Sequence, residues 1–198
     1  MGHSRGGGWA DRLKKHYIGK SFGNSGFYCE VYNLGIDGDI SENLLKRFES
    51  ETKQRIYEGE EIIIIFAIGV NDSQIGTIGI SPKKFRKNIE KLYKLSKKHS
   101  SKIIFIGLIA IDELKTYPIS WDENMFYKNE RIEKYDKIIK SICKKKNIYF
   151  IDMFSEFSKL DYKKLLEDGL HPNSAGHKKM FEVVKDFLAE NKITAQPL

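Results

Sequence analysis

The sequence predicts an α/β fold built around a parallel sheet, and two features lead to that prediction. First, residues Glu61–Ile68 and Lys102–Ala110 form continuous apolar runs rich in isoleucine, as in strands that are covered on both faces. Second, segments with helical periodicity separate such runs, and strands that alternate with helices form βαβ units with right-handed crossovers. We therefore expect parallel strands with helices packed on the sheet.

Weaker patterns complete the expected elements. Tyr28–Leu34 and Asn147–Ile151 are candidate strands. Ser41 and Ser81 suit helix N-caps, and Pro82 suits the first helical position. The expected helices are Ala10–Tyr17, Ser41–Tyr57, Ser81–His99, Glu123–Lys146 and Asn173–Asn191.

Length and composition indicate one globular domain over residues 1–198. Apolar residues make up 40% of the chain and charged residues 31%, which argues against disorder. No apolar run approaches the ~18–20 residues that span a bilayer, and the opening MGHSRGGGW lacks the apolar region of a signal peptide. We therefore expect no membrane span and a cytoplasmic location, unless an upstream signal has been lost. Two cysteines, Cys29 and Cys143, are too few for a disulfide framework or a zinc site.

The net charge of +7 raises the question of a nucleic-acid partner. The excess is mostly lysine, and it is scattered over the expected solvent faces of helices. Lysine also lacks the forked donors that commonly read bases. We expect no nucleic-acid partner, although a basic module that binds nucleic acid through its lysine-rich helices is one alternative function.

The strongest local signal for chemistry is the segment Asp168-Gly169-Leu170-His171-Pro172-Asn173. A carboxylate three residues before a histidine can accept a hydrogen bond from one ring nitrogen and leave the other as a general base. The alternative is an ordinary loop, with Asn173 as a helix N-cap and His171 exposed.

Two further signals follow predicted strands. Asn71, in Gly69-Val70-Asn71-Asp72, can aim its amide donors at an oxyanion, although Asn-Asp is also common turn chemistry and Asp72 suits a cap of that turn. Gly38, in Asn33-Leu34-Gly35-Ile36-Asp37-Gly38-Asp39, can present its backbone N–H at a crowded site; alternatively, it only serves a loop that needs a positive φ. Ligands bind outside the carboxyl ends of strands in open α/β sheets. Together these segments supply the parts of an acyl-transfer site, short of a nucleophile.

In this order, NLGIDGD, GVND and DGLHPNSAGH resemble the second, third and last sequence blocks of the SGNH hydrolases, the GDSL-type esterases and lipases. Gly8-Trp9-Ala10-Asp11-Arg12-Leu13 is similar to the GW-x-x-x-L segment that follows the nucleophile in many members, and Asn129-Glu130-Arg131-Ile132 is similar to another family segment. The resemblance extends from about Gly8 to the end of the chain.

The resemblance implies a flavodoxin-like three-layer α/β/α fold with strand order 2-1-3-4-5, a serine nucleophile, and no metal or cofactor. By position it makes His171 the general base, Asp168 its orienting carboxylate, and Gly38 and Asn71 oxyanion donors. The expected function is a serine esterase that cleaves small-molecule carboxylic esters of lipids, small alcohols or acetylated sugars. The alternative is an inactive domain that only binds a small ester or glycan. Trp121 and Tyr117, in the long irregular stretch 111–122, either line an acyl or alcohol pocket or seal the loop.

The chain departs from the family at its start, where the family has an apolar strand that ends in Gly-Asp-Ser. Here the chain begins Met1-Gly2-His3-Ser4, and Ser4 is either the nucleophile or a residue of a truncated or tag-derived terminus. The first strand is apparently absent, although its loss would remove roughly 7–15 kcal/mol of apolar burial. Three explanations stay open: a shortened version of a longer protein, a replacement from another segment or chain, or a local rearrangement. An open sheet edge also makes a homo-oligomer possible.

Overall fold

Three short apolar strands form a parallel sheet in the computed structural model, which describes residues 7–21 and 28–194. The strands are β1 (Ile63–Phe66), β2 (Lys102–Ile106) and β3 (Tyr149–Ile151), and their spatial order is β1-β2-β3. Ile64 pairs with Ile103, and Ile104 pairs with Tyr149. The predicted parallel sheet is confirmed, with β2 at its centre.

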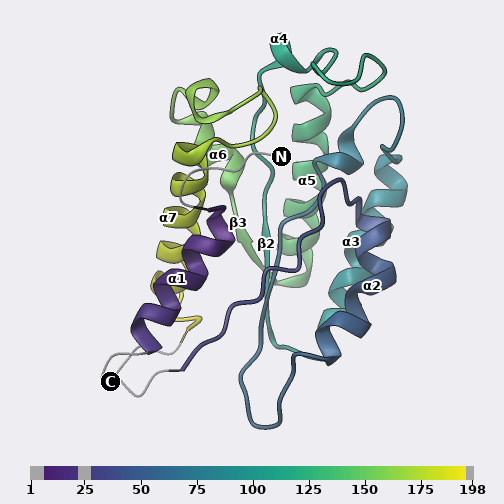
Figure 1. Cartoon of the computed structure of the whole chain (residues 1–198). Helices are drawn as coiled ribbons and strands as arrows, with labels where there is room; N and C mark the ends of the chain where they lie inside the picture. The colour runs from purple at the N-terminus through teal and green to yellow at the C-terminus, as the bar shows by residue number, and fades with distance from the viewer. Residues whose placement is uncertain (1–6, 22–27, 195–198) are drawn as a thin grey trace.

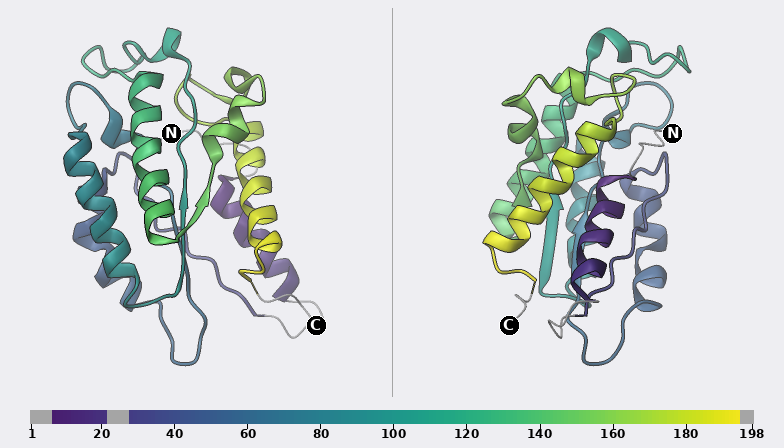
Figure 2. Two further views of the ribbon diagram at one scale, coloured as in Figure 1. Left: turned by 180° about the vertical axis from the view of Figure 1, so that it is seen from behind. Right: turned by 60° about the vertical axis from the view of Figure 1, so that its left-hand side comes forward.

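Helices cover both faces of this sheet (Figure 1). One layer contains α2, α3 and α5, and the other contains α1, α6 and α7, so the fold has three layers. The right-hand view of Figure 2 shows the sheet between these layers. The helices are α1 (Trp9–Ser21), α2 (Ser41–Lys53), α3 (Pro82–Ser96), α4 (Glu113–Thr116), α5 (Asn129–Lys146), α6 (Met153–Ser158) and α7 (Ser174–Glu190), with short 3-10 turns η1 (Asn71–Ser73) and η2 (Tyr162–Leu165).

The central strand divides the core between the two faces. Ile103 and Phe105 belong to the apolar cluster under α2, α3 and α5, whereas Ile104 and Ile106 belong to the cluster under α1, α6 and α7. Successive strand side chains point to opposite faces, so a strand between two helical layers must be apolar at every position. The unbroken apolar run of β2 is thus explained.

The predicted strand Tyr28–Leu34 is wrong, because these residues are extended but pair with no strand among the described residues. Residues 7–21 and 28–62 contain no strand, and the segment forms no hydrogen-bonded ladder with the free edge of β1. Extended conformation and apolar composition do not suffice for a strand without a hydrogen-bonded partner.

Several predicted element ends change. Ser81 is the N-cap of α3 and accepts a hydrogen bond from the Lys84 backbone N–H, and Pro82 is the first helical residue, as predicted. Ser41, however, is the first residue of α2 rather than its N-cap, which is Ile40. The helix expected from Glu123 begins only at Asn129, because the preceding residues form a loop that pairs with Ile75.

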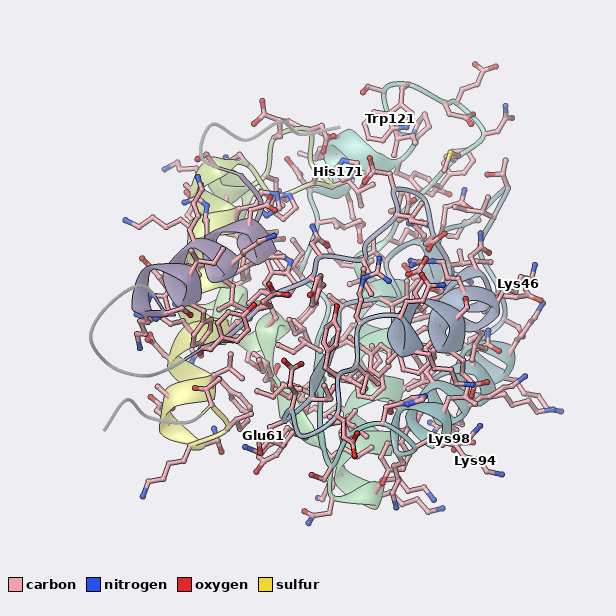
Figure 3. All side chains as sticks on the ribbon, turned by 60° about the horizontal axis from the view of Figure 1, so that its bottom comes forward. Lys46, Glu61, Lys94, Lys98, Trp121 and His171 are labelled. Carbon is pink, nitrogen blue, oxygen red and sulfur yellow. The ribbon has the colours of Figure 1, made fainter. Side chains whose placement is uncertain are left out.

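The surface lysines point away from the body of the protein. Figure 3 shows Lys94 and Lys98 on α3 and Lys46 on α2 extending outward. Lys98 forms an ion pair with Glu49. Within the described part of the chain, no helix is long and apolar enough to cross a bilayer.

Candidate active site

The predicted functional segments lie at one end of the sheet, where all three parallel strands end. The loop after β1 contains η1, the loop after β2 contains α4, and the chain after β3 leads through α6 and η2 to residues 166–173. Figure 1 shows α4 and the neighbouring loops gathered at this end. The fold therefore brings segments that are distant in sequence to the carboxyl ends of the strands.

Asp168 and His171 form a hydrogen-bonded pair in the loop before α7. His171 Nδ1 lies 2.7 Å from Asp168 Oδ2, and Asp168 Oδ1 accepts from the backbone N–H groups of Leu170 and His171 at 2.9 and 2.8 Å. Burial acts to raise the pKa of the Asp168 carboxyl, but these donors outweigh it and hold that pKa below its usual value. An ionised carboxylate only accepts, so Nδ1 is the donor, and in the neutral form of the ring the lone pair is on Nε2.

The backbone of this loop is fixed against the loop after β2. The Asp112 N–H donates to the Gly169 carbonyl at 2.8 Å. Gly169 has a φ of 93°, and a Cβ there would stand 2.6 Å from Cβ of Lys115. Only glycine fits that conformation and that contact, so Gly169 sets the course of the loop that carries His171.

An aromatic side chain covers the histidine. The rings of Trp121 and His171 are stacked, with centroids 5.7 Å apart and planes 28° from parallel, and Figure 3 shows the two side chains together. Trp121 is 53% exposed and Tyr117 is 51% exposed. Both residues belong to the long loop after β2. The stacking places Trp121 beside the candidate base, where it could line a substrate pocket.

Asn71 begins the turn after β1, and its side-chain amide makes two hydrogen bonds. Asn71 Nδ2 donates to the backbone carbonyl of Asp39 at 3.0 Å, and Asn71 Oδ1 accepts from the hydroxyl of Tyr127 at 3.2 Å. Among the described residues, no hydrogen bond is formed by the second N–H of this amide. The structure thus joins the Asn71 segment to the Gly38 segment through the residue that follows Gly38.

Gly38 occupies a tight turn. Its φ is 78°, and the Asp39 N–H donates to the Ile36 carbonyl at 3.2 Å. A positive φ at the third residue of such a turn favours glycine. Arg47 of α2 holds both sides of this turn, because its guanidinium donates to the Leu34 carbonyl at 2.8 Å and to the Asp39 carboxylate at 2.6 Å.

Asp72 has a different role from the predicted cap of its own turn. Its buried carboxylate accepts from the backbone N–H and the hydroxyl of Ser41, and Asn88 donates to the same hydroxyl at 2.9 Å. Burial raises the pKa of Asp72. This network fixes the start of α2 against the end of β1, and Asp72 is a structural residue.

Ser4, the candidate nucleophile, lies outside the described residues. The described chain begins at Gly7, which is bound close to the start of α7. Arg12 Nε donates to the Gly7 carbonyl at 3.1 Å, and another guanidinium nitrogen of Arg12 donates to Ser174 Oγ at 3.0 Å. Ser174 is the first residue of α7 and follows His171 by three residues. Because Arg12 belongs to the first turn of α1, this hydrogen bond places the starts of α1 and α7 side by side.

His177, one turn into α7, packs against this segment. Its ring lies about 4 Å from the position of a Cβ on Gly8. Burial, followed by the charge of Arg12, lowers the pKa of His177. His177 therefore packs between the starts of α1 and α7.

Three residues of the site were missed by sequence reasoning. Tyr127 and Arg47 reach Asn71 and the Gly38 turn from distant positions, and Asn129 was only noted as part of a family segment. Asn129 exchanges two 2.9 Å hydrogen bonds with the backbone of Ile111, one from each end of its amide. No local pattern identifies such side chains. Among residues 7–21 and 28–194, no three metal-ligating side chains gather as a metal site would require.

Solved structures of esterases share this fold. The chain resembles a lipase/acylhydrolase from Enterococcus faecalis with a TM-score of 0.75 and 21% identity, over 96% of this chain and 87% of that one. It resembles an acetylxylan esterase from Geobacillus stearothermophilus with a TM-score of 0.68 and 20% identity, over 93% and 80% of the two chains. At these identities the likeness shows the fold alone.

Sequence comparison identifies the family. No curated protein matches the chain with significance. The sequence model of the GDSL-like lipase/acylhydrolase family, in contrast, matches residues 1–179. That match includes the segments of Gly38, Asn71, Asp168 and His171, and it agrees with the observed fold. The chain therefore belongs to the GDSL-like lipase/acylhydrolase family.

Proposed function

We propose that this ester hydrolase is a serine esterase that uses Ser4, His171 and Asp168. Ser4 Oγ attacks the ester carbonyl carbon while His171 Nε2 accepts the hydroxyl proton, and the oxyanion binds the Gly38 N–H and the Asn71 amide. The tetrahedral intermediate then releases the alcohol, which takes the proton from His171. Water attacks the acyl-enzyme, again with His171 as base, and the carboxylic acid leaves.

The observation that carries this proposal is the Asp168–His171 pair. The carboxylate accepts two backbone N–H groups and the Nδ1–H of the imidazole, so the ring is held in the tautomer that a general base needs. A solvent-facing histidine in a simple loop does not need a carboxylate partner that backbone N–H groups hold in place. Asn71 donates to the carbonyl of Asp39, the residue after Gly38, so the two candidate donors lie close together. Both supply N–H groups for the developing negative charge.

Gly7 and Arg12, which follow the candidate nucleophile Ser4 in the chain, are bound to the start of α7. Ser4 precedes Gly7 by three residues, and three residues span no more than about 11 Å. The Gly7 carbonyl is bound by Arg12, which also binds Ser174 at the start of α7. Gly7, which follows Ser4 closely in the chain, is therefore held near the start of α7, the helix that follows the loop of His171.

The exposed ring of Trp121 supports an ester with a flat or ring-shaped group on the histidine side of the site. One face of Trp121 stacks on His171, while about half of the side chain is exposed. Sugar rings and other apolar faces pack well on such surfaces. We therefore favour small acylated alcohols, including acetylated sugars, over long-chain lipids as substrates.

Labelling with a fluorophosphonate probe, followed by peptide mapping, tests the proposal. Such a probe forms a bond only with an activated serine, so the expected result is a label on Ser4 that His171→Ala abolishes. The matched control is His99→Ala, since His99 lies at the opposite end of the sheet, before β2, and labelling should persist.

Other outcomes are equally informative. A folded protein that carries no label on any serine, and that binds esters without turnover, would show an inactive binding domain instead. A label on a serine other than Ser4 would refute the assigned nucleophile. Labelling that persists in His171→Ala would refute the assigned base.

A further inference from the structure

We infer that Tyr127 is a positioning residue, which orients and polarises the side-chain amide of Asn71 for oxyanion binding. This inference rests on the proposed function, because it concerns the same site. Tyr127 does not touch the reacting atoms; it acts through Asn71. Its hydroxyl is the donor to Asn71 Oδ1, at 3.2 Å, across 56 positions of sequence.

The two hydrogen bonds of Asn71 leave its amide with a single orientation. The Asp39 carbonyl can only accept, so the NH2 group of Asn71 must face it. The hydroxyl of Tyr127 then meets the oxygen end of the amide. A rotation of the amide plane would break both bonds, so the remaining N–H keeps a fixed direction before a substrate arrives. Donors that are fixed in advance are the ones that contribute most to catalysis.

The Tyr127 hydroxyl also strengthens Asn71 as a donor. A hydrogen bond accepted at the amide oxygen draws electron density from the nitrogen, and linked hydrogen bonds polarise one another in a low dielectric. Tyr127 is 2% exposed, and burial raises its pKa to about 12. The hydroxyl therefore keeps its proton, and remains a donor, at every pH at which an esterase is assayed.

The backbone around Tyr127 is anchored well enough for this role. The Tyr127 N–H donates to the Thr116 carbonyl at 2.9 Å, and the Thr116 hydroxyl lies 3.3 Å from the Tyr127 carbonyl. The neighbouring Phe126 pairs with Ile75, shortly after η1. The same loop carries Trp121, which stacks on His171. One loop thus contacts both the candidate base and the candidate oxyanion donor.

The test is Tyr127→Phe, which removes the hydroxyl and keeps the ring. With a p-nitrophenyl ester, we expect kcat to fall about 5- to 20-fold, less than the roughly 100-fold or greater loss that follows removal of an oxyanion donor itself. KM should change less than about threefold, since the lost interaction acts mainly in the transition state. The matched control is Tyr17→Phe, because Tyr17 is also buried, in α1, and its hydroxyl lies by Thr194.

A double-mutant cycle separates positioning from a general structural effect. In an Asn71→Ala background, Tyr127→Phe should lower kcat less than about twofold, because there is no amide left to position. An undiminished loss in that background would overturn the inference. So would a kcat unchanged by Tyr127→Phe alone, or a Tyr127→Phe chain that does not fold while Tyr17→Phe does.

The proposed function fails in a distinguishable way. If the unaltered chain neither hydrolyses the ester nor takes the fluorophosphonate label, the serine mechanism is wrong. In that case Tyr127→Phe should still free the Asn71 side chain, and the NMR signals of its amide protons should shift. Unshifted Asn71 amide signals in Tyr127→Phe would refute the contact itself.

Discussion

Strands β1 and β2 have almost the same composition but very different surroundings. β1 reads Ile-Ile-Ile-Phe and β2 reads Lys-Ile-Ile-Phe-Ile. In β2, Ile104 and Phe105 are completely buried, whereas Ile63, Ile64 and Ile65 of β1 keep part of their surface exposed. β2 pairs on both sides, but β1 pairs only with β2 among the described strands.

The extended segment 28–36 packs through Val31 against the same apolar cluster as Ile63 and Ile65 of β1, and it also exposes apolar side chains. Tyr28 is 71% exposed, Tyr32 45% and Ile36 56%, although parallel sheets are usually covered on both faces. The comparison teaches that apolar composition identifies a strand but not the number of its neighbours. The burial of a strand depends on partners that distant segments supply.

The largest expected difference between the two strands is in stability. Ile104→Ala should lower the free energy of unfolding by about 4 kcal/mol, because it leaves a cavity in the closed core. Ile64→Ala should cost about 1–2 kcal/mol, because Ile64 already contacts solvent and the site can relax. Urea unfolding of both variants measures the two values. Equal losses would show that β1 is as enclosed as β2 in solution.

A second difference concerns the carboxylates at the two strand ends. Asp72 holds Ser41 after β1, and Asp136 accepts from the Leu108 N–H after β2 at 2.8 Å. Burial raises the pKa of Asp136 to about 6, while an unfolded aspartate loses its proton near pH 4. Between these values the folded state binds more protons, so the stability contributed by this group declines as the pH rises from about 4 to 6.

Asp136→Asn should remove that decline. The amide oxygen of asparagine can still accept from Leu108, but it carries no charge to bury. We expect the loss of stability between pH 4 and pH 7 to be smaller by on the order of 2 kcal/mol in the variant, as measured by urea unfolding. Asp186→Asn, on the exposed face of α7, is the control and should follow the unaltered protein. The same pH dependence in Asp136→Asn and the unaltered chain would contradict the prediction.

Strands and site residues that depend on a local pattern were predicted correctly from the sequence. Those that depend on partners far away in the chain were not. The runs around Ile65 and Ile104 identified two strands, because burial on both faces requires unbroken apolar residues. The Asp168–His171 pair was also predicted, because its partners are three residues apart. Tyr28–Leu34 was wrong because strand formation needs a neighbour. Tyr127 was missed because its hydroxyl reaches Asn71 only after the loop folds back.

The smallest expected effect tests whether the extended segment 28–36 contributes to the stability of the fold. Val184 of α7 is a fully buried member of the apolar cluster under α1, α6 and α7, whereas Val31 of that segment is partly buried and packs against it. Val184→Ala should cost about 2 kcal/mol and Val31→Ala less than about 1 kcal/mol, since less methyl surface leaves water at Val31. Urea unfolding at two protein concentrations measures both.

A larger Val31→Ala effect that also depended on concentration would mean that a second copy covers this edge, because only association makes stability depend on concentration. A small effect at both concentrations would mean that the monomer itself leaves the edge of β1 open.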